Sequence, residues 1–169
     1  MKKVTRIITY NAVIGAMYVA LTYAVLELSY GNVQFRFSEA LTVLPVFFPS
    51  AYIGLAVGCA VGNLLSSYGV ADIVLGSLTT LVAGFLTSKI KKVPWALLPP
   101  IVLNALVVPY IIILAGAEPA TYWLNVLTVG GGQTVVIFGL GLPLYYLIKS
   151  RLHMFKFETT EKISDEQEE

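Results

Sequence analysis

Long apolar runs separated by short polar stretches are the main pattern of this sequence. Six apolar segments can be distinguished, at residues 5–28, 38–48, 50–67, 71–90, 94–115 and 122–149. Apolar runs of about 18 or more residues with few charges are typical of membrane-spanning helices. The pattern therefore predicts an all-α integral membrane protein, a bundle of six transmembrane helices.

The second segment is shorter than the others. As an α-helix, residues 38–48 would extend only about 16 Å, roughly half the hydrocarbon core of a bilayer. Pro45 lies inside this segment and Pro49 follows it, and a proline in a helix removes a backbone hydrogen bond and favours a kink. We therefore expect a short, proline-kinked second helix. Residues 130–132, all glycine, and Pro143 are expected to interrupt the sixth segment.

The composition agrees with a membrane location. The chain is 57% hydrophobic and 12% charged, with a mean hydropathy of +0.78, whereas a soluble domain carries about 25% charged residues. Residues 1–150 are expected to form the membrane domain, surrounded by the lipid bilayer. Residues 151–169, which include TTEKISDEQEE, are expected to form a charged, disordered cytoplasmic tail.

Basic residues are gathered in three short clusters. These are Lys2, Lys3 and Arg6, then Lys89, Lys91 and Lys92, and finally Lys149, Arg151 and Lys156. Cytoplasmic loops of membrane proteins are enriched in lysine and arginine, and six crossings place all three clusters on one side. The sequence thus predicts a multi-pass protein of the cell membrane with both termini in the cytoplasm.

Small residues recur at four-residue spacing in the first segment, as Ala12, Ala16, Ala20 and Ala24. Residues four apart lie on one helix face, and small residues let another helix approach closely. This stripe can pack inside the chain or dock a separate membrane protein, and the pattern alone leaves both open. Comparable rows are predicted to pack inside the bundle: Gly54, Gly58 and Gly62, then Gly76, Thr80, Gly84 and Ser88.

Polar residues in the apolar segments gather toward the predicted outer ends. They are Asn63, Asp72, Asn104, Asn125 and Gln133, with Arg36 and Glu39 close by. Each such residue costs a few kcal/mol to insert into lipid. The asymmetry predicts a polar pocket that opens outward, and helix caps or positions among lipid headgroups are the alternative. Arg36 and Glu39, three residues apart, can also pair on one helical turn.

Aromatic residues accompany this polar set, among them Tyr30, Phe35 and Trp123. They can form the belt of aromatic residues found at membrane interfaces. They can equally provide flat surfaces on which a ring-shaped ligand stacks.

Signatures of catalysis are missing from the sequence. It contains no phosphate-binding loop, no G-x-S-x-G elbow and no H-E-x-x-H motif, and its one histidine is His153. The lone Cys59 cannot form an internal disulfide and is expected to pack in the core. We therefore expect no enzyme activity, no ATPase of its own, no cofactor and no metal site, and no nucleic-acid partner.

Four stretches carry a family resemblance: NVQFRFSEALTVLP, GNLLSSYGVADIVLGSLTTL, NALVVPY and GLPLYYLI. Together they resemble the QueT family over residues 8–148. Members are substrate-binding S components of energy-coupling factor (ECF) transporters. The resemblance implies a six-helix bundle with an outward pocket closed by the first outer loop. It also implies two kinds of partner, a transmembrane coupling subunit and two ATPase subunits, with Ala12, Ala16 and Ala20 matching the A-x-x-x-A face that docks the coupling subunit.

The resemblance further implies uptake of a queuosine precursor, a 7-deazaguanine such as the 7-cyano or 7-aminomethyl compound. A carboxylate such as Glu39 or Asp72 can accept two N–H donors of the ring edge. The expected ligand-binding set is Glu39, Arg36, Asn63, Asp72, Asn104, Gln133, Trp123, Phe35 and Tyr30. Glu39 is expected to contact the ligand, and Arg36 to hold the lid by pairing. The resemblance also implies an acidic residue near Gln133, and a neutral amide there weakens the case for binding a cationic aminomethyl group.

Two other functions stay open at this stage. One is a stand-alone small secondary carrier for a nucleobase-like or vitamin-like solute, driven by an ion gradient. The other is a membrane assembly protein that transports nothing and binds no ligand.

Overall fold

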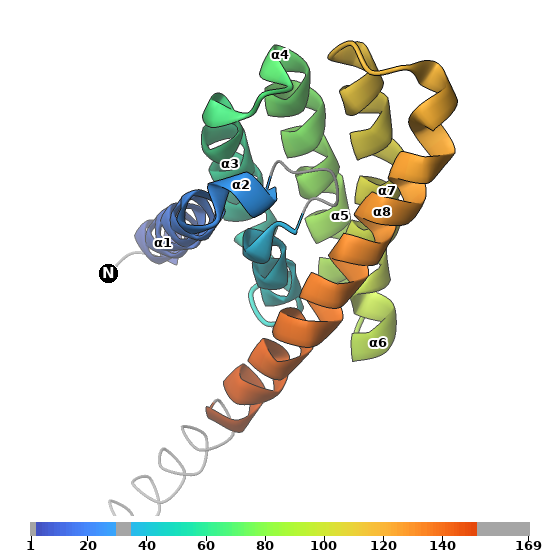
Figure 1. Cartoon of the computed structure of the whole chain (residues 1–169). Coiled ribbons are helices and arrows are strands. Elements are labelled where there is room, and N and C mark those ends of the chain that lie inside the picture. Colours follow the sequence, from blue (N-terminus) through green and yellow to red (C-terminus); the bar gives the residue numbers. More distant parts are fainter. Residues whose placement is uncertain (1–2, 30–34, 152–169) are drawn as a thin grey trace, which may run out of the picture.

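The computed structural model describes residues 3–29 and 35–151, and every regular element in this part of the chain is helical (Figure 1). Tyr30 and residues 152–169 lie outside the described part. In chain order the elements are α1 (Lys3–Ala24), α2 (Leu26–Ser29), η1 (Phe37–Val46), α3 (Ala51–Gly62), η2 (Asn63–Leu65), α4 (Gly69–Ala71), η3 (Asp72–Gly76), α5 (Ser77–Lys89), α6 (Val93–Ala96), α7 (Leu98–Leu114), η4 (Pro119–Thr121), α8 (Tyr122–Val136) and η5 (Ile137–Gly141). The last helix continues from η5 through residues 142–151.

Six apolar helical segments are present, as the hydropathy pattern predicts. Four of them are long and apolar enough to cross a membrane: Val4–Ala24, Gly69–Lys89, Val93–Leu114 and Pro119–Arg151. The other two are shorter, Phe37–Val46 and Ala51–Leu65. Large apolar side chains cover the outside, for example Val70 and Leu127, which are 73% and 74% exposed. The predicted all-α membrane bundle is confirmed.

The short second segment is a 3-10 helix, η1, with Pro45 inside it. A 3-10 helix rises about 2.0 Å per residue against about 1.5 Å in an α-helix, so these ten residues extend about 20 Å. The run from Ser38 to Pro45 is buried throughout. The predicted short, proline-containing helix is confirmed, and its tighter winding and burial inside the bundle are additional findings.

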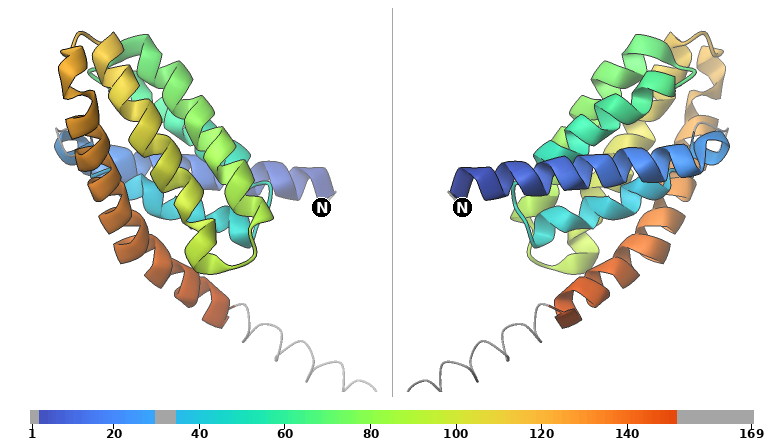
Figure 2. Two further views of the ribbon diagram at one scale, coloured as in Figure 1. Left: turned by 90° about the vertical axis from the view of Figure 1, so that its right-hand side faces the viewer. Right: turned by 90° about the vertical axis from the view of Figure 1, so that its left-hand side faces the viewer.

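Helix α1 crosses the other helices at a steep angle and packs mainly against α3 (Figure 2). The two backbones touch at glycines, since a Cβ added to Gly58 would lie 2.8 Å from the Gly15 carbonyl oxygen. The Gly54 amide donates a hydrogen bond to Asn11 Oδ1 at 2.7 Å. The predicted internal packing of Gly54 and Gly58 is therefore confirmed.

The last helix is continuous where the sequence predicts a break. Residues 130–132 are helical, so the expected interruption by glycines is wrong; Gly132 is buried against the bundle. Pro143 follows the π-helical turn η5. A proline ring clashes with the carbonyl one turn before it in an α-helix, and a wider turn relieves that clash.

Two of the basic clusters lie at one end of the bundle. The loop at residues 90–92 and the end of the last helix are at the bottom of Figure 1, whereas α4 and the turn at residues 115–118 are at the top. Lys91, Lys92 and Arg151 therefore share an end, whereas the start of α1, which carries the first cluster, lies at mid-height in Figure 2, so the predicted gathering of all three clusters on one side stays a prediction. Which end faces the cytoplasm stays a prediction.

Candidate functional site

Six of the predicted polar side chains are buried in the bundle. Each is at most 4% exposed: Arg36, Glu39, Asn63, Asp72, Asn104 and Gln133. They come from helices distant in sequence, from η1 to α8. Buried polar groups are costly unless they are hydrogen-bonded, and ionised ones unless they are also paired. Their partners therefore decide what this region can do.

Glu39, in the first turn of η1, connects three helices through its carboxylate. Tyr18 of α1 donates a hydrogen bond from its hydroxyl to Glu39 Oε1 at 2.5 Å. Asn104 of α7 donates from Nδ2 to Glu39 Oε2 at 3.2 Å. Each carboxylate oxygen of Glu39 thus accepts one hydrogen bond. Hydrogen bonds to an ionised acceptor are stronger than those between two neutral groups.

Tyr18 is a site residue that sequence reasoning missed. It is fully buried, and Thr22, one turn further along α1, donates a hydrogen bond to Ser38 Oγ at 2.8 Å. Tyr18 and Thr22 lie four residues apart, on a face turned away from the alanine stripe. That polar pair, within residues 12–22 that are otherwise apolar, was the signal available in the sequence.

A second buried group forms around Asp72. Its Oδ2 atom lies 3.7 Å from Arg36 Nη2 and accepts a hydrogen bond from Ser66 Oγ at 2.6 Å. Asn63 donates from Nδ2 to the Asp72 backbone oxygen at 2.8 Å. Among the described residues the arginine therefore pairs with Asp72 and not with Glu39. The suggested ion pair between Arg36 and Glu39 is not formed at contact distance: a backbone hydrogen bond of 3.0 Å joins the two residues, and their side chains interact only through longer-range electrostatics.

Gly76 makes this arrangement around Asp72 possible. A Cβ at Gly76 would lie 2.8 Å from both Asn63 Nδ2 and Asp72 Oδ1. We expect Gly76→Ala to lower the free energy of unfolding by about 1–3 kcal/mol, because the added methyl overpacks buried polar groups. Thermal unfolding in detergent measures this. Gly131→Ala is the matched control, as its Cβ meets nothing within 4 Å; equal stability of both variants would contradict the prediction.

Gln133 has a buried side-chain oxygen, Oε1, that accepts no hydrogen bond from the described residues. Gln133 follows Gly130 by about one turn on the same face of α8, and a Cβ at Gly130 would lie 3.3 Å from the Ala105 Cβ of α7, so this face of α8 is turned toward α7. A buried acceptor left open in this way is suited to a donor from a ligand.

Trp123 and Phe35, the two predicted aromatic residues that the structure describes, are not among the contacts of the polar group given above. Trp123 is 71% exposed and lies edge-on to the Tyr122 ring. Phe35 and Phe37 line a separate groove against residues 135–140 of the last helix. Tyr30 lies outside the described residues. The exposed position of Trp123 matches the membrane-interface interpretation.

The alanine stripe faces outward. Ala12, Ala16 and Ala20 are exposed, and together with Gly58 and Val61 of α3 they line a shallow groove. The stripe therefore does not pack inside this chain, which was one of its two interpretations.

The buried ionisable groups do not balance. Among the described buried side chains, one cation, Arg36, faces two carboxylates, Glu39 and Asp72, so one carboxyl group is left without a cation of its own and is either protonated or matched by a bound cation. Within the described residues, no group of three His, Cys, Asp or Glu side chains could hold a metal ion. An unbalanced charge inside a membrane bundle is costly, and a cationic ligand would compensate it.

Comparison with known proteins gives two findings. The profile of the family described as QueT transporter matches residues 8–150. A protein named Queuosine precursor transporter QueT, from Lactococcus lactis subsp. cremoris (strain MG1363), is 40% identical over 73 residues. The aligned part covers 42% of this chain and 43% of that relative. No solved structure matches the chain.

Proposed function

The chain belongs to the QueT transporter family, and from this premise we propose that it is the substrate-binding membrane subunit of an ECF-type importer that takes up a 7-deazaguanine precursor of queuosine. The name of the Lactococcus relative supports the substrate class. The observation that carries the proposal is that Glu39, Asp72 and Gln133, side chains that are costly to place in lipid, are buried inside a membrane bundle.

The polar group has the chemistry that a deazaguanine requires. Glu39 accepts the N–H donors of the amino-pyrimidine edge, and the open oxygen of Gln133 accepts another donor. Asn63 and Asn104 supply amides for the carbonyl and pyrrole edges. Arg36 and Asp72 hold one wall of the pocket through their ion pair. Trp123, which is exposed, anchors the bundle at the membrane interface.

We place the partners by the same reasoning. The transmembrane coupling subunit docks on the exposed stripe of Ala12, Ala16 and Ala20, where small side chains allow close helix contact. Two ATPase subunits supply the energy, since this sequence has no phosphate-binding loop. The termini, with their basic clusters, lie in the cytoplasm.

The unbalanced negative charge predicts which deazaguanine is preferred. The 7-aminomethyl compound is a cation and neutralises the charge left by Glu39, whereas the 7-cyano compound is neutral. We expect the aminomethyl compound to bind at least tenfold more tightly, equivalent to about 1.4 kcal/mol. Calorimetric titration of the purified chain with both compounds measures the ratio, with adenine and guanine as controls. Equal affinities for the two deazaguanines would contradict the charge argument.

The same titration tests the function itself. Saturable binding restricted to deazaguanines supports the proposal, and no binding by a folded sample removes this substrate and favours an assembly protein. A stand-alone carrier is distinguished by reconstituting the chain alone in liposomes. Substrate uptake driven by an imposed ion gradient, without ATPase subunits, would replace the ECF proposal.

A further inference from the structure

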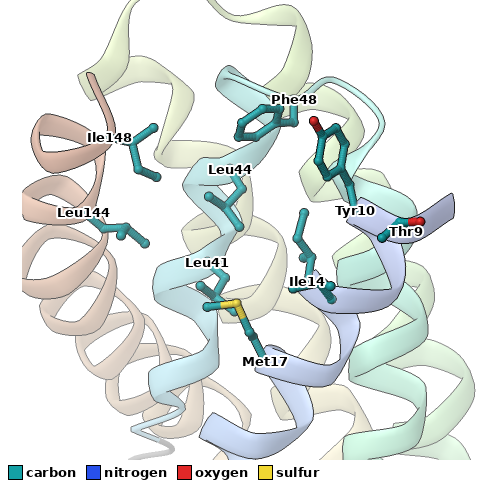
Figure 3. Close-up of a pocket in the computed structure, with 10 residues that line it drawn as sticks. Thr9, Tyr10, Ile14, Met17, Leu41, Leu44, Phe48, Leu144 and Ile148 are labelled. Atoms are coloured by element: carbon teal, nitrogen blue, oxygen red, sulfur yellow. The ribbon is translucent and has the colours of Figure 1, made fainter. Parts of the chain in front are cut away.

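An apolar groove of about 430 Å³ runs between α1, η1 and the last helix (Figure 3). Leu41 and Leu44 of η1 form its floor, and Ile14 of α1 and Leu144 of the last helix stand on opposite sides. Its lining is almost entirely apolar. The volume lies within the range of pockets that hold small-molecule ligands, about 300–1,000 Å³.

The two ends of the apolar groove differ. Met17 and Leu41 lie at one end, and Tyr10 and Phe48 lie at the other (Figure 3), where their ring centroids are 5.7 Å apart. Ile148 of the last helix lies toward the same end as Phe48. Tyrosine is common where an apolar region meets lipid headgroups, so the Tyr10–Phe48 end is the one suited to a polar group.

Beyond the Tyr10–Phe48 end of the apolar groove, an arginine follows the lining residues on each of the two flanking helices. Arg6 precedes Tyr10 by four residues, and Arg151 follows Ile148 by three, so each lies one helical turn further along the lining face. Both are exposed. Among the described residues the one ion pair is that of Arg36 with Asp72, so no described carboxylate neutralises Arg6 or Arg151.

We propose that the apolar groove binds an acyl chain of an anionic phospholipid, whose headgroup lies against Arg6 and Arg151. The shape of the charge distribution supports a lipid, because a groove that is apolar along its length and basic at one end matches an amphiphile with one charged end. Guanidinium groups bind phosphate with paired hydrogen bonds. Basic pockets between membrane helices select anionic headgroups. The predicted sidedness places this lipid in the inner leaflet.

The lipid bound by the purified full chain tests the proposal. Native mass spectrometry compares phosphatidylglycerol with phosphatidylcholine of identical acyl chains, titrated into the detergent-solubilised protein. We expect phosphatidylglycerol to bind more tightly. Each of Arg6→Gln and Arg151→Gln is expected to weaken it about fivefold and the double variant about 30-fold. Lys89→Gln with Lys91→Gln is the matched control, because neither lysine lines the apolar groove or belongs to the two helices that carry Arg6 and Arg151.

Two further measurements separate the alternatives. Leu144→Trp fills the apolar groove and is expected to reduce binding of both lipids, while thermal unfolding reports whether the variant is folded. A photo-crosslinking residue at position 13, whose native Val13 also lines the apolar groove, reports the occupant in the assembled transporter. Equal affinity for the two lipids, an unchanged affinity in the double variant, or crosslinks to a protein subunit instead of lipid would each overturn the proposal.

Discussion

Glu39→Gln is expected to weaken binding of 7-aminomethyl-7-deazaguanine by roughly 100-fold or more, in keeping with the cost of removing one partner of a buried charged pair. The substitution keeps the side-chain shape but removes the charge that balances the ligand. The side-chain NH2 group of the new glutamine must also face either the Tyr18 hydroxyl or the Asn104 amide. Both of these groups donate a hydrogen bond to the native carboxylate. Isothermal titration of the purified variant measures the effect.

Glu118→Gln is the matched control for this experiment. Glu118 is an exposed carboxylate in the loop before η4, outside the polar group, and its substitution is expected to leave affinity unchanged. Tyr18→Phe removes one donor and keeps the ring, so we expect a smaller loss, about tenfold. If folded Glu39→Gln protein binds as the native chain does, the role assigned to Glu39 is wrong.

Ala16→Leu is expected to reduce transport to the background level while leaving ligand affinity within about twofold. Ala16 is exposed in the middle of the stripe, and a leucine there holds a partner helix away from the α1 backbone. It lies on a face turned away from Tyr18, so the ligand site is not disturbed. Uptake by cells that express the complete transporter and titration of the isolated variant provide the two readouts.

Ala120→Leu serves as the matched control, because Ala120 is also exposed but lies in η4, far along the chain from the stripe. Co-purification of the coupling subunit should be lost in Ala16→Leu and kept in the control. Normal co-purification and uptake by Ala16→Leu would show that the partner docks elsewhere.

The sequence predicted the helical bundle well because lipid imposes a simple requirement. Each spanning segment must be apolar and must satisfy its own backbone hydrogen bonds, so hydropathy alone located all six segments. The 3-10 winding of η1 could not be predicted, since runs of this kind longer than three or four residues are uncommon. Pro45 indicated an irregular helix but not its type.

The buried polar side chains were predicted in part, whereas their role as a ligand site stays a prediction. Costs of insertion into lipid identified the six buried polar residues, because such residues are rare enough to be conspicuous. The pairing between them depends on helix crossings that sequence spacing does not contain. Arg36 therefore meets Asp72 rather than Glu39, which is its neighbour in sequence. Tyr18 escaped notice because tyrosine is common in membrane helices, and its partner lies 21 residues away.

Helix α1 presents two different surfaces on opposite faces. On one face of α1 the Tyr18 hydroxyl donates a hydrogen bond to Glu39, and the other face presents the alanine stripe. Glycine contacts pack α1 directly against the α3 backbone. Under the proposed docking, a shift of α1 that accommodates the coupling subunit would also change the geometry around Glu39. Allosteric coupling of this kind is reciprocal: whatever factor a docked partner applies to ligand affinity, the ligand applies to the affinity for that partner.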